Sequence, residues 1–243
     1  MWIVDPLSTL LRCYPFQDVT ASDLEPLLSS FVRREYRRGE TIWSEGDPAE
    51  ELWFILKGAV HGLHSTPDGE EIVTMLYGPG ESFGEIGLFL PDQTRRVRCI
   101  ATDDTTLMGL PRDRLLAFIC DHPAALKRML EMTSVMAFRQ GVSFREHALR
   151  DVRRRVAWRL LDMVERHAEP VAGGTRINLR LTQTILAGIV GASRPNVSRA
   201  LSSFSAAGAI RLEGGYIIVR NADQLRAALG SDEGMLLDAD HRS

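Results

Sequence analysis

The strongest constraint on the fold of this chain is a change in the pattern of its apolar residues at Pro123. Between Thr41 and Leu110, short apolar runs rich in β-branched and aromatic residues alternate with turns that contain glycine or proline. Such runs at intervals of about 8–12 residues are typical of a β-roll or barrel. After Pro123 no proline occurs until Pro170, which predicts a long helix. The pattern therefore predicts an α+β protein whose N-terminal β-roll is followed by helices.

The long helix after Pro123 is expected to carry a mostly apolar seam at near-heptad spacing. Its positions are Leu126, Met129, Thr133, Met136, Gln140 and His147. A seam of this kind packs against another helix, often a twofold copy, or against the β domain of its own chain. Both contacts can hold at once because the helix has two faces available. Gly141 interrupts the seam at a cost of about 1 kcal/mol in helix propensity, which predicts a hinge between domains.

Two shorter helices are predicted from capping residues and apolar periodicity. Ser22 can cap a helix over residues 21–31, ahead of the β-roll. Asp151 is expected to begin a second, amphipathic helix, which Pro170 and the pair Gly173-Gly174 end.

The segment that follows has the spacing of a helix-turn-helix. Thr182 can cap a first helix, and Ala187 is small where two helices must approach closely. Gly191 comes four residues later, where the turn needs a conformation that glycine adopts cheaply. Ser193 can cap the second helix, and Val197, ten residues after Ala187, packs it onto the first. The runs 210–212 and 216–219, separated by two glycines, then predict a hairpin, the wing of a winged helix-turn-helix.

The second helix of such a motif lies in the major groove of DNA, with its N-terminal residues at base edges. Arginine can pair with guanine and asparagine with adenine, while hydroxyls and amides at helix starts meet phosphates. The candidates for base edges are Arg194, Asn196, Ser198 and Arg199, and those for phosphates are Thr182, Gln183 and Ser193.

The charge distribution agrees with a polyanion-binding segment. The whole chain has a net charge of −3, with histidine counted as neutral. Residues 145–220 contain 13 arginines, no lysine and six acidic residues, a net charge of +7, whereas the rest of the chain, with 16 basic and 26 acidic residues, carries −10. A basic segment on an otherwise acidic protein is the pattern expected of a domain that binds nucleic acid.

The composition and the motifs of the chain limit the cellular compartment and the kinds of chemistry that we expect for it. No apolar run approaches the length of about 20 residues that a membrane span needs, and no secretory signal is visible, so a cytoplasmic protein is expected. Cys13, Cys99 and Cys120 are widely spaced and are interpreted as buried thiols rather than as a disulfide or metal set. No nucleophile–base pair, metal-ligand cluster or phosphate loop is apparent, so neither an enzyme nor a metal cofactor is predicted.

Three segments resemble the Crp–Fnr family of bacterial regulators, and the likeness extends to about Leu229. They are residues 54–60 (FILKGAV), residues 84–89 (GEIGLF) and residues 191–199 (GASRPNVSR). The resemblance implies a jelly-roll-like cyclic-nucleotide-binding domain, a long dimerisation helix and a winged helix-turn-helix. The corresponding domains are residues 1–120 for the effector, 121–150 for dimerisation and the hinge, 151–229 for DNA, and a flexible tail over 230–243.

The resemblance also implies an effector site in the β-roll. In relatives that respond to cyclic AMP, the loop beginning at Gly84, Glu85 and Ile86 holds the nucleotide. Glu85 would accept a hydrogen bond from the ribose 2′-hydroxyl, and Arg95 would pair with the cyclic phosphate.

The chain departs from those relatives at three places. Arg96 stands where they have a small hydroxyl residue, and Gln140 and Gly141 stand where two adjacent hydroxyl residues contact adenine. Gln140 can still bond a purine edge, and a second guanidinium favours anions while it crowds the pocket. Three alternatives follow: weak binding of cyclic AMP, binding of another nucleotide or anionic effector, or an empty pocket. Pro195 replaces a glutamate that accepts from cytosine, which predicts altered preference at that base pair.

The leading hypothesis is a homodimeric transcription regulator that binds a near-palindromic duplex operator, responds to an effector and contacts RNA polymerase. One alternative is an effector-independent or thiol-modulated regulator of the same fold. Another is a cyclic-nucleotide-binding module that regulates a partner protein.

Overall fold

The computed structural model describes residues 5–65, 71–148 and 151–229. The chain forms two compact units, Met1–Gln140 and Gly141–Ser243. The predicted tail over residues 230–243 lies outside the described residues. The predicted domain boundaries at 120, 150 and 229 stay a prediction.

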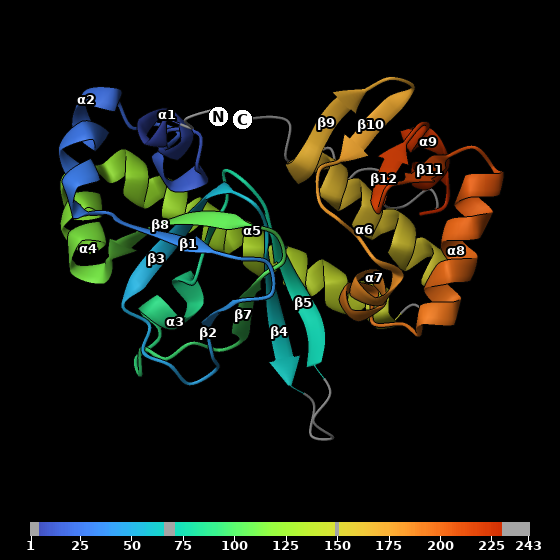
Figure 1. The fold of residues 1–243 in the computed structure, drawn as a ribbon, viewed down its shortest axis with the longest axis horizontal. Helices are drawn as coiled ribbons and strands as arrows, with labels where there is room; N and C mark the ends of the chain where they lie inside the picture. The colour runs from blue at the N-terminus through green and yellow to red at the C-terminus, as the bar shows by residue number, and fades with distance from the viewer. Residues whose placement is uncertain (1–4, 66–70, 149–150, 230–243) are drawn as a thin grey trace. The chain divides into compact units, whose positions relative to one another are not determined.

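The N-terminal unit is built on two antiparallel four-stranded sheets (Figure 1). One has the strand order β1-β8-β3-β6 and the other β2-β7-β4-β5. The strands are β1 (Val32–Tyr36), β2 (Thr41–Trp43), β3 (Glu51–Lys57), β4 (Val60–Ser65), β5 (Glu71–Tyr77), β6 (Ser82–Phe83), β7 (Arg98–Ala101) and β8 (Thr105–Pro111). The β-roll predicted from the glycine-punctuated runs is confirmed, and it begins earlier than expected, at β1.

Strand β3 joins the two hydrophobic cores of this unit. Because successive side chains of a strand point to opposite faces, Phe54 and Leu56 enter a core with the N-terminal helices. Trp53 and Ile55 enter the core between the sheets, against Phe83. A strand buried on both faces must be apolar throughout, which explains its continuous apolar run.

Helices cover the first of these cores. They are α1 (Pro6–Leu10), α2 (Ala21–Leu24), α4 (Arg112–Asp121) and α5 (Pro123–Ala148), with the 3-10 helices η1 (Tyr14–Phe16) and η2 (Glu25–Ser30); a further helix, α3 (Glu85–Phe89), follows β6. The helical stretch predicted over residues 21–31 is found as α2 followed by η2, but the cap predicted at Ser22 is wrong. Thr20 is the N-cap and accepts from the backbone N–H of Asp23. Pro26 lacks the N–H that would continue the α-helical ladder, so the chain tightens into η2.

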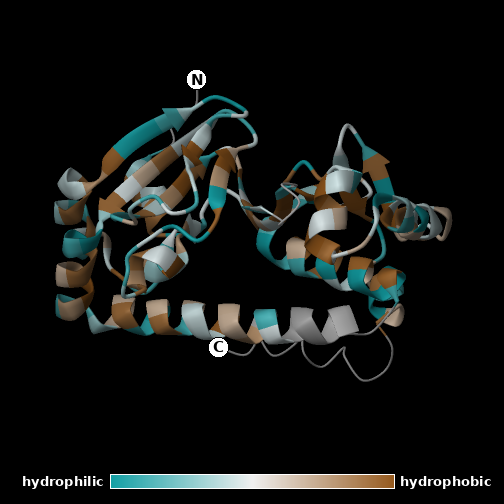
Figure 2. Cartoon of the chain, turned by 90° about the horizontal axis from the view of Figure 1, so that it is seen from below, coloured by the Kyte–Doolittle hydropathy of each residue, from teal (hydrophilic) through white to brown (hydrophobic). Residues whose placement is uncertain are grey.

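The long helix α5 confirms the helix predicted after Pro123. Ala125 and Met129 are buried in the core of the N-terminal unit. Leu126, Leu130 and Phe138 remain between 40% and 60% exposed, so α5 keeps apolar side chains outside that core. Hydrophilic and hydrophobic residues are interleaved along α5 (Figure 2). Within the described part of the chain, no helix has both the length and the apolarity to cross a membrane.

In its described residues, the C-terminal unit combines one four-stranded antiparallel sheet, in the order β11-β12-β10-β9, with helices packed around it (Figure 1). The elements are α6 (Val152–His167), β9 (Ala168–Val171), β10 (Gly174–Ile177), α7 (Gln183–Val190), α8 (Arg194–Ala206), β11 (Ile210–Glu213), β12 (Tyr216–Val219) and α9 (Ala222–Ala227). The predicted start of α6 at Asp151 is confirmed, since its carboxylate accepts from the backbone N–H of Arg153.

The hairpin β9–β10 was not expected from the sequence. At Pro170 and the pair Gly173-Gly174 the sequence predicts only the end of a helix. Instead α6 ends at His167, Pro170 lies within β9, Gly173 lies in the connection and Gly174 begins β10; both glycines have positive φ angles. Proline is tolerated in β9 because this strand is at the edge of the sheet.

Candidate effector pocket and nucleic-acid interface

A pocket in the N-terminal unit lies beside α3 and is open to solvent. It contains about 510 Å³ of empty space, counting its open mouth. Five of the six predicted effector residues line it: Gly84, Glu85, Ile86, Arg95 and Arg96. The other lining residues are Trp43, His64, Met75, Tyr77, Phe83, Gly87, Val97 and Cys99. Gln140, the sixth predicted residue, is exposed on α5 and is not part of this lining.

Glu85 is the first residue of α3 and is a buried part of the pocket lining. Gly84 is the N-cap of that helix and has a φ of 97°, a left-handed conformation suited to glycine. The Glu85 side chain is only 4% exposed, and its Oε2 atom has no hydrogen-bond partner among the described residues. Burial raises the pKa of Glu85 to about 6, against the opposing effects of a hydrogen bond that its carboxyl accepts from its own backbone N–H and of the Arg95 charge.

Arg95 is the buried guanidinium of the pocket, with 3% of the residue exposed. Its Nη1 donates to the carbonyl oxygen of Gly84 at 3.1 Å, and its Nη2 donates to that of Glu51 at 3.0 Å. The guanidinium carbon lies 4.1 Å from the ring centroid of Trp43. Arg95 thus contacts the residue before α3, the first residue of strand β3 and the Trp43 ring.

Arg96 lies at the rim of the pocket rather than inside it. Its side chain is 44% exposed, and its Nη2 atom donates to both carboxylate oxygens of Asp92, at 2.5 and 2.6 Å. The two adjacent arginines therefore differ sharply in accessibility. The sequence alone could not predict this difference.

The apolar wall of the pocket is a stack of three aromatic rings. The ring centroids of Trp43 and Phe83 are 5.0 Å apart, and those of Phe83 and Tyr77 are 5.4 Å apart. The Trp43 indole N–H donates to the carbonyl oxygen of Val97, which fixes its orientation. This wall can cover a planar or apolar part of a small molecule.

The three cysteines do not share one environment. Cys13 and Cys99 are buried, as expected, but Cys120 is exposed on α4, so the interpretation of all three as buried thiols is wrong for Cys120. Burial raises the pKa values of Cys13 and Cys99 to about 12, which disfavours their reactive thiolate forms. No group of His, Cys, Asp and Glu suited to a metal ion occurs among the described residues.

The helix-turn-helix of the C-terminal unit has the geometry that its spacing predicts. Thr182 caps α7 by accepting from the backbone N–H of Ile185 at 3.2 Å. Gly191 ends α7 in a left-handed conformation with a φ of 62°, and Val197 is fully buried. Ser193 occupies the N-cap position of α8, but its side chain makes no capping hydrogen bond, in contrast to the prediction.

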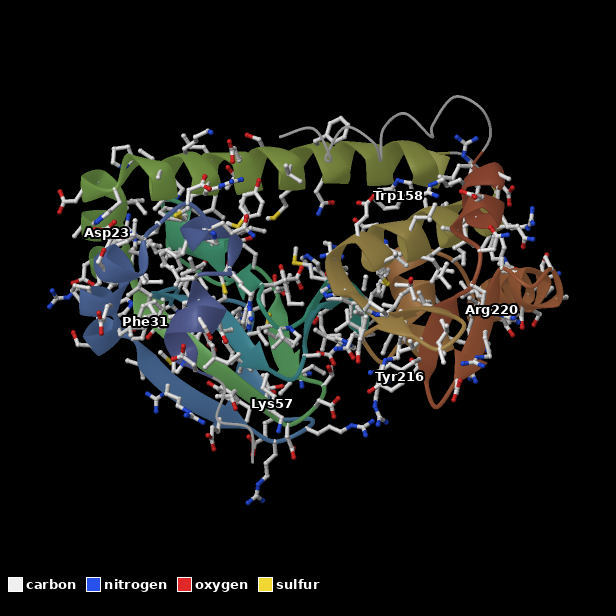
Figure 3. The ribbon with its side chains drawn as sticks, turned by 90° about the horizontal axis from the view of Figure 1, so that it is seen from above. Asp23, Phe31, Lys57, Trp158, Tyr216 and Arg220 are labelled. Carbon is white, nitrogen blue, oxygen red and sulfur yellow. The ribbon has the colours of Figure 1, made fainter. Side chains whose placement is uncertain are left out.

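The seven predicted DNA-contacting residues lie on α7, α8 and the residues that precede these helices. Those that are exposed are Thr182, Ser193, Arg194 and Arg199, and those that are partly buried are Gln183, Asn196 and Ser198. The Arg199 guanidinium donates to the Asn196 side-chain oxygen, so these two candidates for base contacts are coupled on one face of α8. The wing is also present, with Tyr216 at the start of β12 and Arg220 just after its end (Figure 3).

Arg155 on α6 contacts the turn of the helix-turn-helix, and the sequence did not single it out. Its Nη1 atom donates to the carbonyl oxygens of Val190 and Gly191, both at 2.9 Å. These carbonyls end α7 and form the turn before α8. In the sequence Arg155 is one of three consecutive arginines, and only the fold shows which one reaches the turn.

Several other arginines of the basic segment have intramolecular partners. Arg159 and Arg166 both pair with Asp162, which is almost fully buried. Arg176 pairs with Glu169, and Arg211 pairs with Glu213. Part of the positive charge counted in the sequence is therefore already paired within this unit.

Comparison with known proteins identifies both parts of the chain. Residues 33–122 match the family model of the cyclic nucleotide-binding domain, and residues 154–228 match that of the Crp-like helix-turn-helix domain. The "CRP-like cAMP-activated global transcriptional regulator" of Mycobacterium tuberculosis is 31% identical over 216 residues, which are 89% of this chain and 96% of that protein. The chain belongs to the Crp–Fnr family.

Solved structures of the Crp–Fnr family share this architecture. FixK2 from Bradyrhizobium japonicum has a TM-score of 0.72 at 24% identity, over 83% of this chain and 98% of that chain, which shows the fold. The c-di-GMP responsive regulator CLP from Xanthomonas campestris has a TM-score of 0.66 at 27% identity, over 82% of this chain and 99% of that chain. This Crp–Fnr protein is a transcription regulator with a cyclic nucleotide-binding domain and a DNA-binding helix-turn-helix.

The buried Glu85 predicts a specific pH dependence of stability in this Crp–Fnr protein. A carboxyl whose pKa is raised in the folded state destabilises the fold once it ionises. The free energy of unfolding should therefore fall by about 2 kcal/mol as the pH rises from 4.5 to about 6, and this contribution stays constant at higher pH. Glu85→Gln should remove this fall, whereas Glu45→Gln, at an exposed position, should preserve it. Urea unfolding at several pH values measures the difference, and equal slopes for E85Q and the wild type would contradict the prediction.

Proposed function

We propose that this regulator is a homodimer whose binding to DNA is modulated by a nucleotide effector in the β-roll pocket. The observation that carries the proposal is the Glu85 Oε2 atom, a buried acceptor without a partner among the described residues, in a pocket open to solvent. A buried acceptor left unpaired costs free energy that a ligand hydroxyl can offset. The pocket residues therefore fit a ligand that brings a hydrogen-bond donor.

A cyclic nucleotide meets the chemical demands of this pocket. Its ribose hydroxyl would donate to Glu85, its phosphate would accept from a guanidinium of the lining, and its base would pack on the aromatic wall. The names of two relatives mention cAMP and c-di-GMP, so effectors differ within the family. We propose cyclic AMP as the first effector to test, with another nucleotide or anion as the alternative.

Helix α5 supports the proposal of a dimer. Leu126, Leu130 and Phe138 remain exposed on it, although large apolar side chains favour burial. A twofold copy of α5 would cover these side chains in a coiled-coil-like contact. Two copies would then present two α8 helices to a near-palindromic operator, with half-sites about one helical turn apart. RNA polymerase is the protein partner that we propose for the bound dimer.

We propose that α8 reads the major groove through Arg194, Asn196, Ser198 and Arg199, while Thr182, Gln183 and Ser193 contact phosphates. These seven residues lie on or just before the two helices of the motif, and none of them is fully buried. Arg199→Ala should weaken operator binding about tenfold, because a guanine contact is worth about 1–3 kcal/mol. Binding to a scrambled duplex should change less than threefold, since the loss is one of base recognition.

Fluorescence anisotropy with an operator duplex tests this function directly. The affinity of the wild-type protein should rise when cyclic AMP is added, and Glu85→Gln should reduce that rise. An operator affinity that no nucleotide changes would favour the effector-independent alternative. Burial disfavours the thiolates of Cys13 and Cys99, so the thiol-modulated alternative would depend on the exposed Cys120.

A further inference from the structure

We propose that Asn196 holds Arg199 in position to read guanine, and that the reading face of α8 selects bases whose major-groove edges accept hydrogen bonds, guanine and thymine. This inference rests on the proposed function, since it takes α8 as the helix that lies in the major groove. It replaces the role expected for Asn196 from the sequence, in which an asparagine pairs with adenine. Asn196 is a positioning residue, and Arg199 makes the base contact.

The contact between Arg199 and Asn196 fixes the orientation of the Asn196 amide. The Nη2 atom of Arg199 donates to the Oδ1 atom of Asn196, which lies three residues earlier on the same helix surface. A guanidinium has donors but no acceptor, so the amide atom that faces it must be the oxygen. Asn196 is partly buried and Arg199 is exposed, so the residue nearer the core supports the one nearer solvent.

The packing of α8 gives this contact a fixed frame. Val197, Ala200, Leu201 and Phe204 are buried at the spacing of one helix face. Arg199 is exposed, and a long side chain on a fixed backbone retains rotamer freedom that binding must remove. The hydrogen bond to the neighbouring amide restricts that freedom before DNA is bound. It therefore lowers the entropy cost of the base contact.

This hydrogen bond also removes the acceptor that an adenine contact needs. An asparagine that pairs with adenine directs both amide atoms at the base, so that the oxygen accepts from N6 and the nitrogen donates to N7. With its oxygen turned toward Arg199, the Asn196 amide offers the groove only its N–H donors. Guanine and thymine present a carbonyl oxygen where adenine and cytosine present an amino group. The donors of Asn196 therefore fit guanine or thymine.

The rest of the motif has no carboxylate that could accept from an amino group. No aspartate or glutamate occurs between Pro170 and Leu212, although this range contains five arginines. Pro195, exposed in the first turn of α8, has no polar side chain, and the exposed Arg194 beside it only donates. The Ser198 hydroxyl can donate or accept, so it opposes neither class of base. The reading face as a whole is thus matched to acceptors.

Selection of duplexes from a randomised pool by the full-length protein, with and without cyclic AMP, tests the inference. Arg199→Ala should lose the preference for guanine at one position of each half-site, which identifies the base that Arg199 reads. Asn196→Ala should weaken the same preference about fivefold, because the arginine is present but no longer held in place. Ser205→Ala, at an exposed polar residue in the last turn of α8, is the control and should change no preference.

Asn196→Asp separates positioning from base reading. Its carboxylate keeps an acceptor for Arg199, so the guanine preference should stay within about twofold of the wild type. It has no N–H donor, so at the base beside that guanine the preference should move from guanine or thymine to cytosine or adenine, whose amino groups donate. Anisotropy titration of duplexes that differ at one base pair measures each preference as a ratio of affinities.

Each outcome decides the inference. A guanine preference that N196A weakens and N196D retains supports it. If N196A keeps the full guanine preference that R199A loses, or if the wild type selects adenine at the position that N196D alters, Asn196 reads a base by itself; the inference is then wrong while the proposed function stands. If the wild type enriches no duplex in either condition, the proposed function fails together with the inference. Thermal unfolding of N196A and N196D should match the wild type within about 2 °C, since substitutions near the surface have small effects on stability.

Discussion

Arg155→Met is expected to lower operator affinity about 100-fold and the free energy of unfolding of the C-terminal unit by about 2–3 kcal/mol. The substitution removes the donor for the carbonyls of Val190 and Gly191, at the end of α7 and in the turn before α8. Hydrogen bonds to a charged group contribute about 1.5–3 kcal/mol each. The bond to Val190 is partly buried and the bond to Gly191 is exposed, so most of the loss comes from the first. Without these two hydrogen bonds the turn holds the angle between α7 and α8 less firmly, so the residues proposed to read bases are misplaced. Anisotropy titration and urea unfolding measure the two effects.

Arg153→Met is the matched control for this prediction. It removes the same charge from the same helix, α6, but from a side chain that lies over the Phe204 ring at 4.8 Å rather than on the turn. A cation–π contact at such a site is worth about 0.5–1 kcal/mol, so operator affinity should fall less than fivefold. Equal losses of operator affinity in R153M and R155M would show that net charge, and not the hydrogen bonds from Arg155 to the turn, determines binding.

Gly87→Ala is expected to destabilise the N-terminal unit by about 3 kcal/mol and to abolish effector binding. A Cβ atom at this position of α3 would lie 2.4 Å from the carbonyl oxygen of Thr94 and 3.0 Å from the Cβ of Ala49. The first of these atoms belongs to the backbone, so the strain cannot be relieved by turning a side chain. Helix α3, which begins with Glu85, must therefore shift away from the segment that carries Thr94 and Arg95. Denaturant unfolding followed by tryptophan fluorescence measures the loss.

Gly141→Ala provides the contrasting control on α5. An added Cβ atom there meets no atom within 4 Å, and alanine favours a helix over glycine by about 0.5–1 kcal/mol. This variant should therefore be slightly more stable than the wild type. If G87A were as stable as G141A, the close approach of Gly87 in α3 to the Thr94 carbonyl oxygen would not constrain the fold.

The features predicted correctly from the sequence are those encoded by neighbouring residues. Thr182 and Gly191 define the start and end of α7 through local backbone chemistry, and both are found in these roles. The wing was predicted from two apolar runs around a pair of glycines, which form β11 and β12. The alternation of turns and apolar runs likewise predicted the β-roll, because each strand is short and bounded by its own turns.

The features that were missed depend on residues far apart in the chain. Arg155 reaches carbonyls 35 and 36 residues away, so no local pattern distinguishes it from its arginine neighbours. Strand β10 is stabilised by pairing with β12, and β9 pairs with β10, although this hairpin contains Pro170 and two glycines. Local propensity is a weak guide where a distant strand supplies the hydrogen bonds.

The pocket likewise could be predicted only in part, because some of its features depend on residues far apart in the chain. The family resemblance led to Gly84, Glu85, Ile86, Arg95 and Arg96, and the fold brings these five residues to one pocket. It could not reveal that Arg95 is buried under Trp43 while Arg96 is exposed, because burial depends on how two sheets and a loop meet. Gln140 was grouped with them by sequence position, but it is exposed on α5 and outside the pocket lining.

The ion pairs within the C-terminal unit affect how DNA binding should depend on ionic strength. Each phosphate that a protein neutralises releases condensed counterions, and this gives a slope of about −0.9 per phosphate in a plot of log affinity against log salt concentration. Arg159, Arg166 and Arg176 already have carboxylate partners, so they contribute little to this release. The slope should be shallower than the formal charge of the segment suggests. The regulator would then depend on base contacts, more than on charge, to remain at its site when cellular ion concentrations rise.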